Sequence, residues 1–185
     1  MKIKFLLLNS LIACTVILGG CSSKEEKKEN PVANETDKEK VKSTSKNGKY
    51  TFKDGKVIVH DADIVITKYK VIPPGEEGNE YGKESVIAFW FDITSKTDEK
   101  KVSPISWMAI FDAYQDNNEN KVNKLDVASH PDKELMKDQF SELKKGGTLS
   151  GAIAYKLTDN TTPVILKAHK GIGGEELGTQ EFKIN

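Results

Sequence analysis

The chain has 185 residues, and its 28 lysines balance 28 acidic residues without any arginine, so the formal net charge is zero. This length allows one folded domain with tails. The balanced charge excludes a protein that binds nucleic acid through bulk positive charge. Two cysteines are too few for a disulfide framework, and a chain without arginine lacks the bidentate fork that phosphate sites favour.

Residues 1–20 have the composition of a signal peptide. Lys2 and Lys4 precede an apolar stretch at 5–18, which is too short and too interrupted to span a membrane. The segment ends in Leu-Gly-Gly-Cys, which resembles the lipobox of bacterial lipoproteins. The alternative is an ordinary signal peptide with a chance cysteine, but Cys21 falls where the lipoprotein pattern places it and charged residues begin soon after, at Lys24.

The lipobox resemblance implies cleavage before Cys21 and a diacylglycerol on its thiol, with a further acyl group such as palmitate on the new amine. Two acyl chains are the number that stable membrane anchoring needs. We therefore expect a protein held on the extracytoplasmic face of the cell membrane by Cys21.

Residues 21–48 are predicted to be the lipidated cysteine followed by a disordered tether. After Cys21 the apolar residues are Val32, Ala33 and Val41, among many lysines and glutamates. Such a segment buries too little apolar surface to offset the entropy of ordering it. The folded domain is then expected to occupy residues 49–185.

Strand patterns dominate the first half of that domain. Asp54-Gly55 predicts a hairpin turn between two short strands, and residues 64–71 are rich in β-branched side chains. The clearest strand is 86–93, in which every second residue is apolar. The four residues on the predicted core face are Ile87, Phe89, Phe91 and Ile93. A second strand is expected at 105–114, with Trp107, Ala109, Phe111 and Ala113 on one face.

The second half predicts more strands and one helix. A turn at 116–120 leads into an antiparallel strand at 121–128. A short helix is expected from Ser129 or His130, with Met136, Phe140 and Leu143 on one face. Further strands are expected at 148–157, 164–168 and 179–184. About eight short strands predict a mainly β fold, an antiparallel two-sheet immunoglobulin-like sandwich with one short helix.

Three sequence motifs add a family resemblance. The first two are Phe-Asp-Ile-Thr-Ser-Lys-Thr at 91–97 and Ala-Tyr-Gln-Asp at 113–116. The third is Lys-Gly at 145–146, followed by a predicted strand that ends in Tyr-Lys-Leu-Thr-Asp at 155–159. The chain resembles a bacterial lipoprotein family with an uncharacterised telokin-like, immunoglobulin-like domain. The resemblance implies the sandwich fold, and with the all-lysine usage it suggests a Gram-positive cell. It implies no catalytic residues, because none are assigned in the family.

Two places in the sequence contain residue types that can bind a metal ion. His60-Asp61-Ala62-Asp63 contains ligand-type residues, but we favour a strand end because neighbouring residues face opposite ways. The turn 116–120 has oxygen ligands that suit weak Ca²⁺ binding, but it lacks the glycine and distal glutamate of an EF-hand. His130 is expected to start a helix, and His169 to lie on an exposed loop edge. No cofactor or metal is predicted.

The residues most suited to recognition are aromatic side chains on non-core faces, since Trp and Tyr are favoured at interfaces. We select Trp90, Tyr69 and Tyr114. The predicted function is a non-catalytic binding module outside the membrane, with an envelope protein, a wall polymer, or a phage or peptide as partner. The alternative is a hydrolase or metal-dependent enzyme, whose site would gather a histidine with two carboxylates from separate loops.

Overall fold

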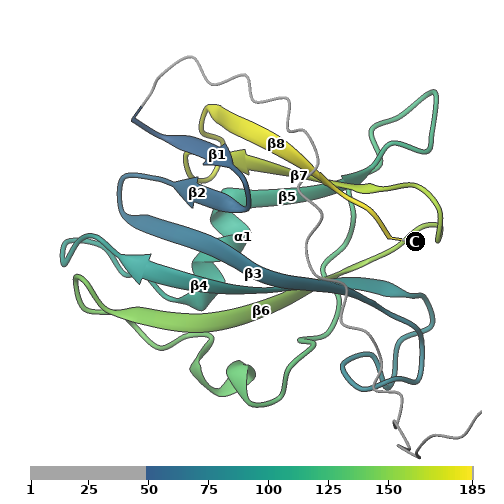
Figure 1. Ribbon diagram of the computed structural model, residues 1–185, viewed down its shortest axis with the longest axis horizontal. Helices are drawn as coiled ribbons and strands as arrows, with labels where there is room; N and C mark the ends of the chain where they lie inside the picture. The colour runs from purple at the N-terminus through teal and green to yellow at the C-terminus, as the bar shows by residue number, and fades with distance from the viewer. Residues whose placement is uncertain (1–48, 185) are drawn as a thin grey trace, which may run out of the picture. The chain divides into compact units, whose positions relative to one another are not determined.

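The computed structural model describes residues 49–184, so the predicted signal peptide at 1–20, Cys21 and the tether at 21–48 lie outside the described residues. Two antiparallel sheets pack face to face (Figure 1). The five-stranded sheet has the order β1 (Thr51–Lys53), β2 (Lys56–Ile58), β3 (Ala62–Ile72), β4 (Val86–Ser95) and β6 (Thr148–Lys156). The three-stranded sheet has the order β5 (Phe111–Gln115), β7 (Val164–His169) and β8 (Glu176–Phe182). The predicted mainly β sandwich is confirmed.

The β1–β2 hairpin forms where the sequence predicts it. Asp54 and Gly55 have φ angles of 51° and 72°. Two successive residues in the left-handed region are typical of the tight turn that suits the twist of a hairpin.

The core lies between the two sheets and is built around β4. Ile87, Phe89, Phe91 and Ile93 are all buried on its inner face, as the alternation predicts. Trp107 lies at the centre, with ring centroids 4.4 Å from Phe91 and 4.2 Å from Phe111. Its Nε1 donates a hydrogen bond of 2.9 Å to the buried Tyr155 hydroxyl, so the indole is both packed and satisfied.

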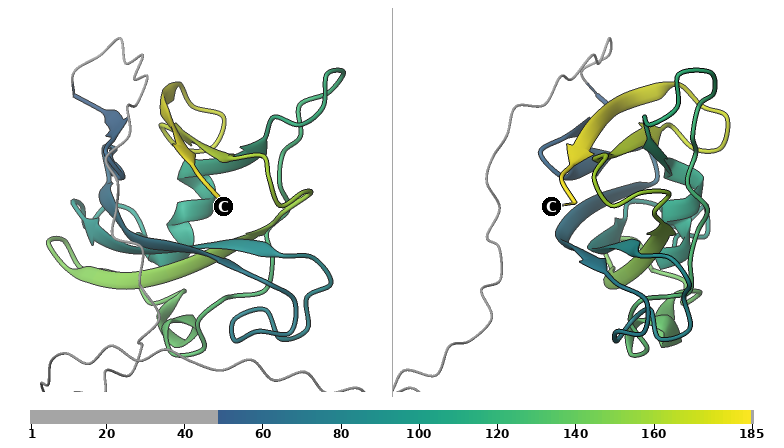
Figure 2. Two further views of the ribbon diagram at one scale, coloured as in Figure 1. Left: turned by 45° about the vertical axis from the view of Figure 1, so that its right-hand side comes forward. Right: turned by 90° about the vertical axis from the view of Figure 1, so that its right-hand side faces the viewer.

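The strand predicted at 105–114 is wrong in its first half. The chain forms a 3-10 turn, η1 (Pro104–Ser106), and a helical turn, α1 (Trp107–Ile110), before β5 begins at Phe111. Pro104 fixes the entry, and the Ser103 N–H donates to Ser106 Oγ (3.2 Å). Trp107 and Ile110 are three residues apart and both buried, a spacing that suits a helix as well as the core. Figure 2 shows α1 between the two sheets.

The helix predicted at 129–143 shrinks to one 3-10 turn, η2 (Leu135–Asp138). Its expected core face is not buried, since Met136 and Phe140 are 52% and 69% exposed. The chain instead runs beside residues 102–105. The Ile105 N–H donates to Gln139 O (2.9 Å) and the Leu143 N–H to Val102 O (2.8 Å), and this pairing replaces helix formation.

The strand predicted at 121–128 is also wrong, because this segment crosses between the sheets. It forms single bridges on each side, Tyr114 with Lys124 and Val127 with Tyr155. It therefore joins the β5 edge of one sheet to the β6 edge of the other. On the opposite side the Gly55 N–H donates to Gln180 Oε1 (2.7 Å), which ties the β1–β2 turn to β8.

Within residues 49–184, no helix has the length and apolar character needed to cross a membrane.

Candidate functional site

One stretch of β6 has backbone groups without hydrogen-bond partners, although its residues from Gly151 to Tyr155 are buried. The Ala128 N–H donates to Ala154 O (2.8 Å) and the Lys156 N–H to Asp126 O (2.9 Å), so these groups of β6 point away from β4. Outward-pointing residues alternate along an antiparallel strand. Ser150 and Ala152 therefore also direct their backbone N–H and C=O groups outward. Among residues 49–184, no backbone or side-chain group bonds to these outward groups.

A hollow of about 250 Å³ lies at this edge. Ala152 and Ala154 line the hollow from one face of β6, and Ile153 lines it from the other face. Because residues from both faces take part, the hollow lies beside the edge of the strand. Pro104 forms one wall, because its Cβ is close enough to Gly151 to leave no room for a side chain there. The other lining residues are Phe91, Ile105, Trp107, Met108, Val127, Ala128, His130, Met136 and Gln139.

Three of the lining residues are large, apolar and exposed. Met108, Val127 and Met136 are 50%, 42% and 52% exposed, although all three are large and apolar. Methionine adapts its unbranched side chain to irregular partners and is common at surfaces that bind varied ligands. The lining contains no lysine, aspartate or glutamate, so the hollow suits an uncharged group.

His130 is the one titratable side chain in the lining. Its Nδ1 accepts a hydrogen bond of 3.2 Å from the Asp132 N–H, which assigns the proton of the neutral ring to Nε2. Burial lowers the pKa of His130 below its ordinary value, although the nearby Asp132 carboxylate opposes this. The Nε2 atom is buried and has no hydrogen-bond partner within the described part of the chain. A buried donor without an acceptor is costly, so an acceptor brought to it would be stabilised.

Asp132 holds the segment that carries His130 against the outer face of the five-stranded sheet. Trp90 Nε1 donates to Asp132 Oδ2 (3.0 Å), while the N–H groups of Glu134 and Leu135 donate to Oδ1 (3.0 and 3.1 Å). Asp132, not Ser129 or His130, is thus the residue that caps the turn. Burial alone would raise the pKa of Asp132, but these hydrogen bonds outweigh it and lower the pKa.

The three predicted contact residues lie in three different places, and none lines the hollow. Trp90 is half-buried on the outer face of the five-stranded sheet, with Lys68 Nζ 4.7 Å from its ring centroid. Tyr69 is on the inner face, in edge contact with Phe182, and 40% of it is exposed. The structure therefore does not bring these residues into one site.

Tyr114 belongs to a polar cluster on the outer face of the three-stranded sheet. Its hydroxyl donates to Asp112 Oδ2 (3.3 Å), and Lys124 Nζ lies 2.6 Å from Oδ1 of the same carboxylate. His169 is the last residue of β7, with Nε2 3.6 Å from Asp112, so its predicted place on an exposed loop edge is wrong. Burial is the main cause that raises the pKa of the Tyr114 hydroxyl.

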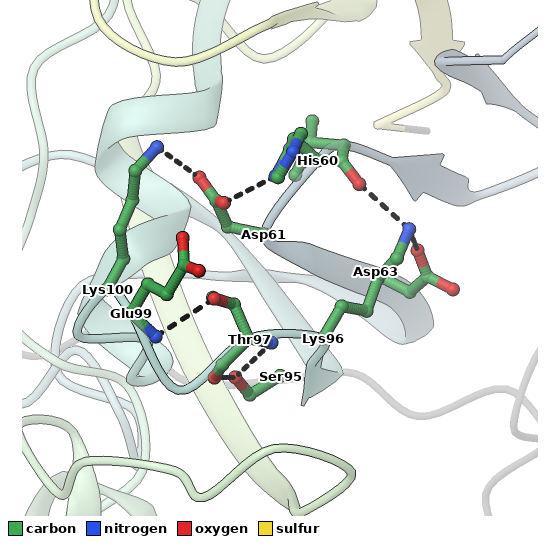
Figure 3. A network of polar contacts seen from close by, with 9 residues as sticks. His60, Asp61, Asp63, Ser95, Lys96, Thr97, Glu99 and Lys100 are labelled. Carbon is green, nitrogen blue, oxygen red and sulfur yellow. Dashed lines mark hydrogen bonds and ion pairs between the residues drawn. The ribbon is translucent and has the colours of Figure 1, made fainter.

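The carboxylates near His60 are engaged by lysines (Figure 3). Lys100 Nζ donates to Asp61 Oδ2 (2.7 Å), and Lys96 Nζ donates to Asp63 Oδ1 (3.0 Å). The Lys100 hydrogen bond is the main cause that lowers the pKa of Asp61. Each carboxylate thus serves a different lysine, an arrangement of surface ion pairs. Across residues 49–184, no three His, Cys, Asp or Glu side chains gather as a metal site would need.

Two asparagines of the turn at 116–120 make hydrogen bonds within the fold. Asn118 Oδ1 accepts from the N–H groups of Asn120 and Lys121 (3.0 and 3.1 Å). Asn117 donates to Asp159, whose pKa is held far below its usual range, mainly by the Thr162 N–H and then by Asn117. The Asn117 contact joins two loops, and the turn's own backbone uses both lone pairs of Asn118 Oδ1.

Sequence reasoning did not identify the residues of the hollow. The sequence predicts Met136 on the core face of a helix and residues 148–157 as an ordinary strand. No local signal marks these residues, because the hollow forms only where segments distant in the sequence meet.

Comparisons with known proteins agree with this fold. A family model for a domain of unknown function, DUF5067, matches residues 35–170. The chain belongs to this family. The expected membership of a family without known function is confirmed.

Among solved structures, a candidate lipoprotein from Staphylococcus aureus subsp. aureus NCTC 8325 superposes with a TM-score of 0.61 at 23% identity. The match covers 73% of this chain and 92% of that chain, and at this identity it shows a shared fold. A search of curated proteins gave no match.

Proposed function

We propose that this DUF5067 protein is a lipid-anchored lipoprotein of a Gram-positive cell envelope, whose domain binds a partner without catalysis. The anchor is Cys21, in the Leu-Gly-Gly-Cys motif, and the domain acts on the extracytoplasmic face of the membrane. The candidate lipoprotein with the same fold supports this proposal.

The observation that carries the binding role is the apolar hollow at the β6 edge. Exposed methionines beside an unpaired strand edge are unfavourable in a free protein, because they leave apolar surface and backbone groups without partners. The alternative of a hydrolase or metal-dependent enzyme needs a histidine with two carboxylates in one pocket. The hollow contains His130 but no carboxylate, which favours binding over hydrolysis.

A photo-crosslinking amino acid in place of Met136 tests this function in living cells that make the full chain. We expect a light-dependent adduct with an envelope component, weakened by Met108→Ser on the far side of the hollow. The matched control places the same amino acid at Ile172, which is 92% exposed and outside the hollow. Equal adducts at both positions, or none at Met136, would refute a binding role for this surface.

A further inference from the structure

We infer that Met108 and Met136 form a site of reversible oxidation, at which a two-electron oxidant outside the membrane converts both thioethers to sulfoxides and weakens binding at the hollow. This inference rests on the proposed binding function and adds its regulation. Oxidation turns the flexible, apolar side chain of methionine into a polar one, and reductases specific for the sulfoxide restore it.

The first support is the position of the methionines. The sequence has three, and Met1 lies in the predicted signal peptide. The other two come from separate elements, Met108 from α1 and Met136 from η2, and both line the hollow. Every methionine of the described domain therefore lies at the surface to which we assign binding.

The second support is exposure. Met108 and Met136 are 50% and 52% exposed, so an oxidant in the solvent reaches them without any opening of the fold. The two cysteines of the sequence, Cys14 and Cys21, precede residue 49, so no thiol within 49–184 consumes the oxidant first. Compartments outside the membrane also lack the thiol systems that keep the cytosol reduced.

The chemistry is a two-electron oxidation of sulfur, for which hypochlorous acid serves as the test oxidant. The sulfur attacks the chlorine atom, so an S–Cl bond forms, the Cl–O bond breaks and hydroxide leaves. The oxygen of a water molecule then displaces chloride and releases two protons, one of which neutralises the hydroxide. In total the thioether loses two electrons and gains one oxygen, and hypochlorous acid is reduced to chloride.

The third support is the effect that a sulfoxide has on this lining, which contains no lysine, aspartate or glutamate. A sulfoxide oxygen is a polar acceptor, and an apolar group that covers it leaves it without a hydrogen bond. Each sulfoxide should therefore weaken binding about tenfold. In the free protein both side chains are half exposed, so the sulfoxides stay in water and the fold keeps its stability.

The first test measures the oxidation itself. The full chain in detergent is treated with hypochlorous acid, and mass spectrometry of its peptides follows each sulfoxide. Ile172→Met supplies an exposed reference at a position that is 92% exposed, and Leu166→Met a buried one at a position that is 0% exposed. We expect Met108 and Met136 to oxidise within about threefold of the exposed reference, without a change in melting temperature. Rates equal to that of the buried reference would refute the site.

The second test measures binding in living cells, with a photo-crosslinking amino acid in place of Val127, which also lines the hollow. Hypochlorous acid before illumination should reduce the adduct at least about tenfold. The loss should follow the sulfoxide fractions of Met108 and Met136, and reductases for both sulfoxide epimers should reverse it. The matched control combines Met108→Leu with Met136→Leu, which conserves apolar volume. It should lose none of its own adduct under the same treatment.

The possible outcomes separate this inference from the proposed function. An adduct that falls equally in the leucine double variant, or that the reductases do not restore, would refute control by these methionines and leave the binding function intact. No adduct at position 127 or 136 before any oxidant is added would refute the proposed function and, with it, the control of binding. The sulfoxide rates would then still establish or exclude the oxidation site itself.

Discussion

Phe89 and Phe91 are the residues on which the core depends most directly. Both are buried on the inner face of β4 and contact the Trp107 ring. Substitution of either by Ala should lower the free energy of unfolding by about 3–5 kcal/mol. Trp90 lies between them on the outer face and is half-buried, so Trp90→Ala should cost less. Equilibrium urea unfolding of the three variants measures these values, and a larger loss for Trp90→Ala would contradict the facing assignment.

Tyr155 links stability to pH through a single buried hydroxyl. Tyr155→Phe removes the acceptor of the Trp107 N–H and should cost about 1–3 kcal/mol. Burial raises the pKa of Tyr155 above its ordinary value, against a smaller opposing effect of the Trp107 hydrogen bond. The unfolded chain therefore loses this proton first, and the stabilisation declines as the pH rises above about 10.

Unfolding curves between about pH 8 and pH 11 test this linkage. The wild-type free energy of unfolding should fall more steeply than that of Tyr155→Phe. If the free energy of unfolding fell with pH at the same rate in both proteins, the pKa of the Tyr155 hydroxyl would be the same in the folded and unfolded states.

At the scale of elements, Asp132 holds the segment 129–139 on the sheet. Asp132→Ala removes the cap and the partner of Trp90, which should cost about 1 kcal/mol and shift Trp fluorescence to longer wavelength. Asp132→Asn keeps an oxygen for the cap and is the matched control. An unshifted spectrum for Asp132→Ala would mean that Trp90 stays covered without this bond.

The Asp132 carboxylate also makes the free energy of unfolding depend on pH under acidic conditions. Burial would raise its pKa, but hydrogen bonds from Trp90, Leu135 and Glu134 lower it overall. Its stabilisation is thus present above the ordinary aspartate pKa of about 4 and is lost as the pH falls through the lower folded-state value. In Asp132→Asn this part of the acid dependence should be missing.

The elements that the sequence predicts well are those whose local pattern and tertiary role agree. Strand β4 has a clean alternation and a buried inner face, and the Asp54-Gly55 turn needs only local geometry. Residues 105–110 and 129–143 carry patterns that fit both helix and strand, and their form depends on pairing with distant segments. The hollow could not be predicted because it arises only where residues 104–108, 127–139 and β6 meet.

For the whole molecule, the anchor is the first prediction to check. Cys21→Ala should give a precursor without acyl groups and with its signal peptide uncut or cut elsewhere. Mass spectrometry of the wild-type N-terminus should show acyl mass on Cys21. An unmodified Cys21 in the mature protein would contradict the lipoprotein assignment.

The segment between anchor and domain should contribute reach and not stability. The core residues of the described domain run from Phe52 to Phe182. Deletion of residues 24–46 should therefore change the free energy of unfolding by no more than about 0.5 kcal/mol and leave the melting temperature unchanged within error. Partner capture in cells should fall, because a short linker lowers the chance of encounter. A scrambled segment of equal composition should restore it, and failure to do so would reveal a recognition motif within 22–48.

The order of strands also determines how this domain would respond to tension. If the chain is anchored at Cys21 and a partner binds at the hollow beside β6, as proposed, tension between the two crosses four ladders in series. Those between β1 and β2 and between β2 and β3 have three register pairs each, whereas β3–β4 has ten and β4–β6 has nine. The N-terminal hairpin should therefore peel away first and expose Phe52. Under such a load the domain would extend at its N-terminal hairpin while the β4–β6 ladder stays intact.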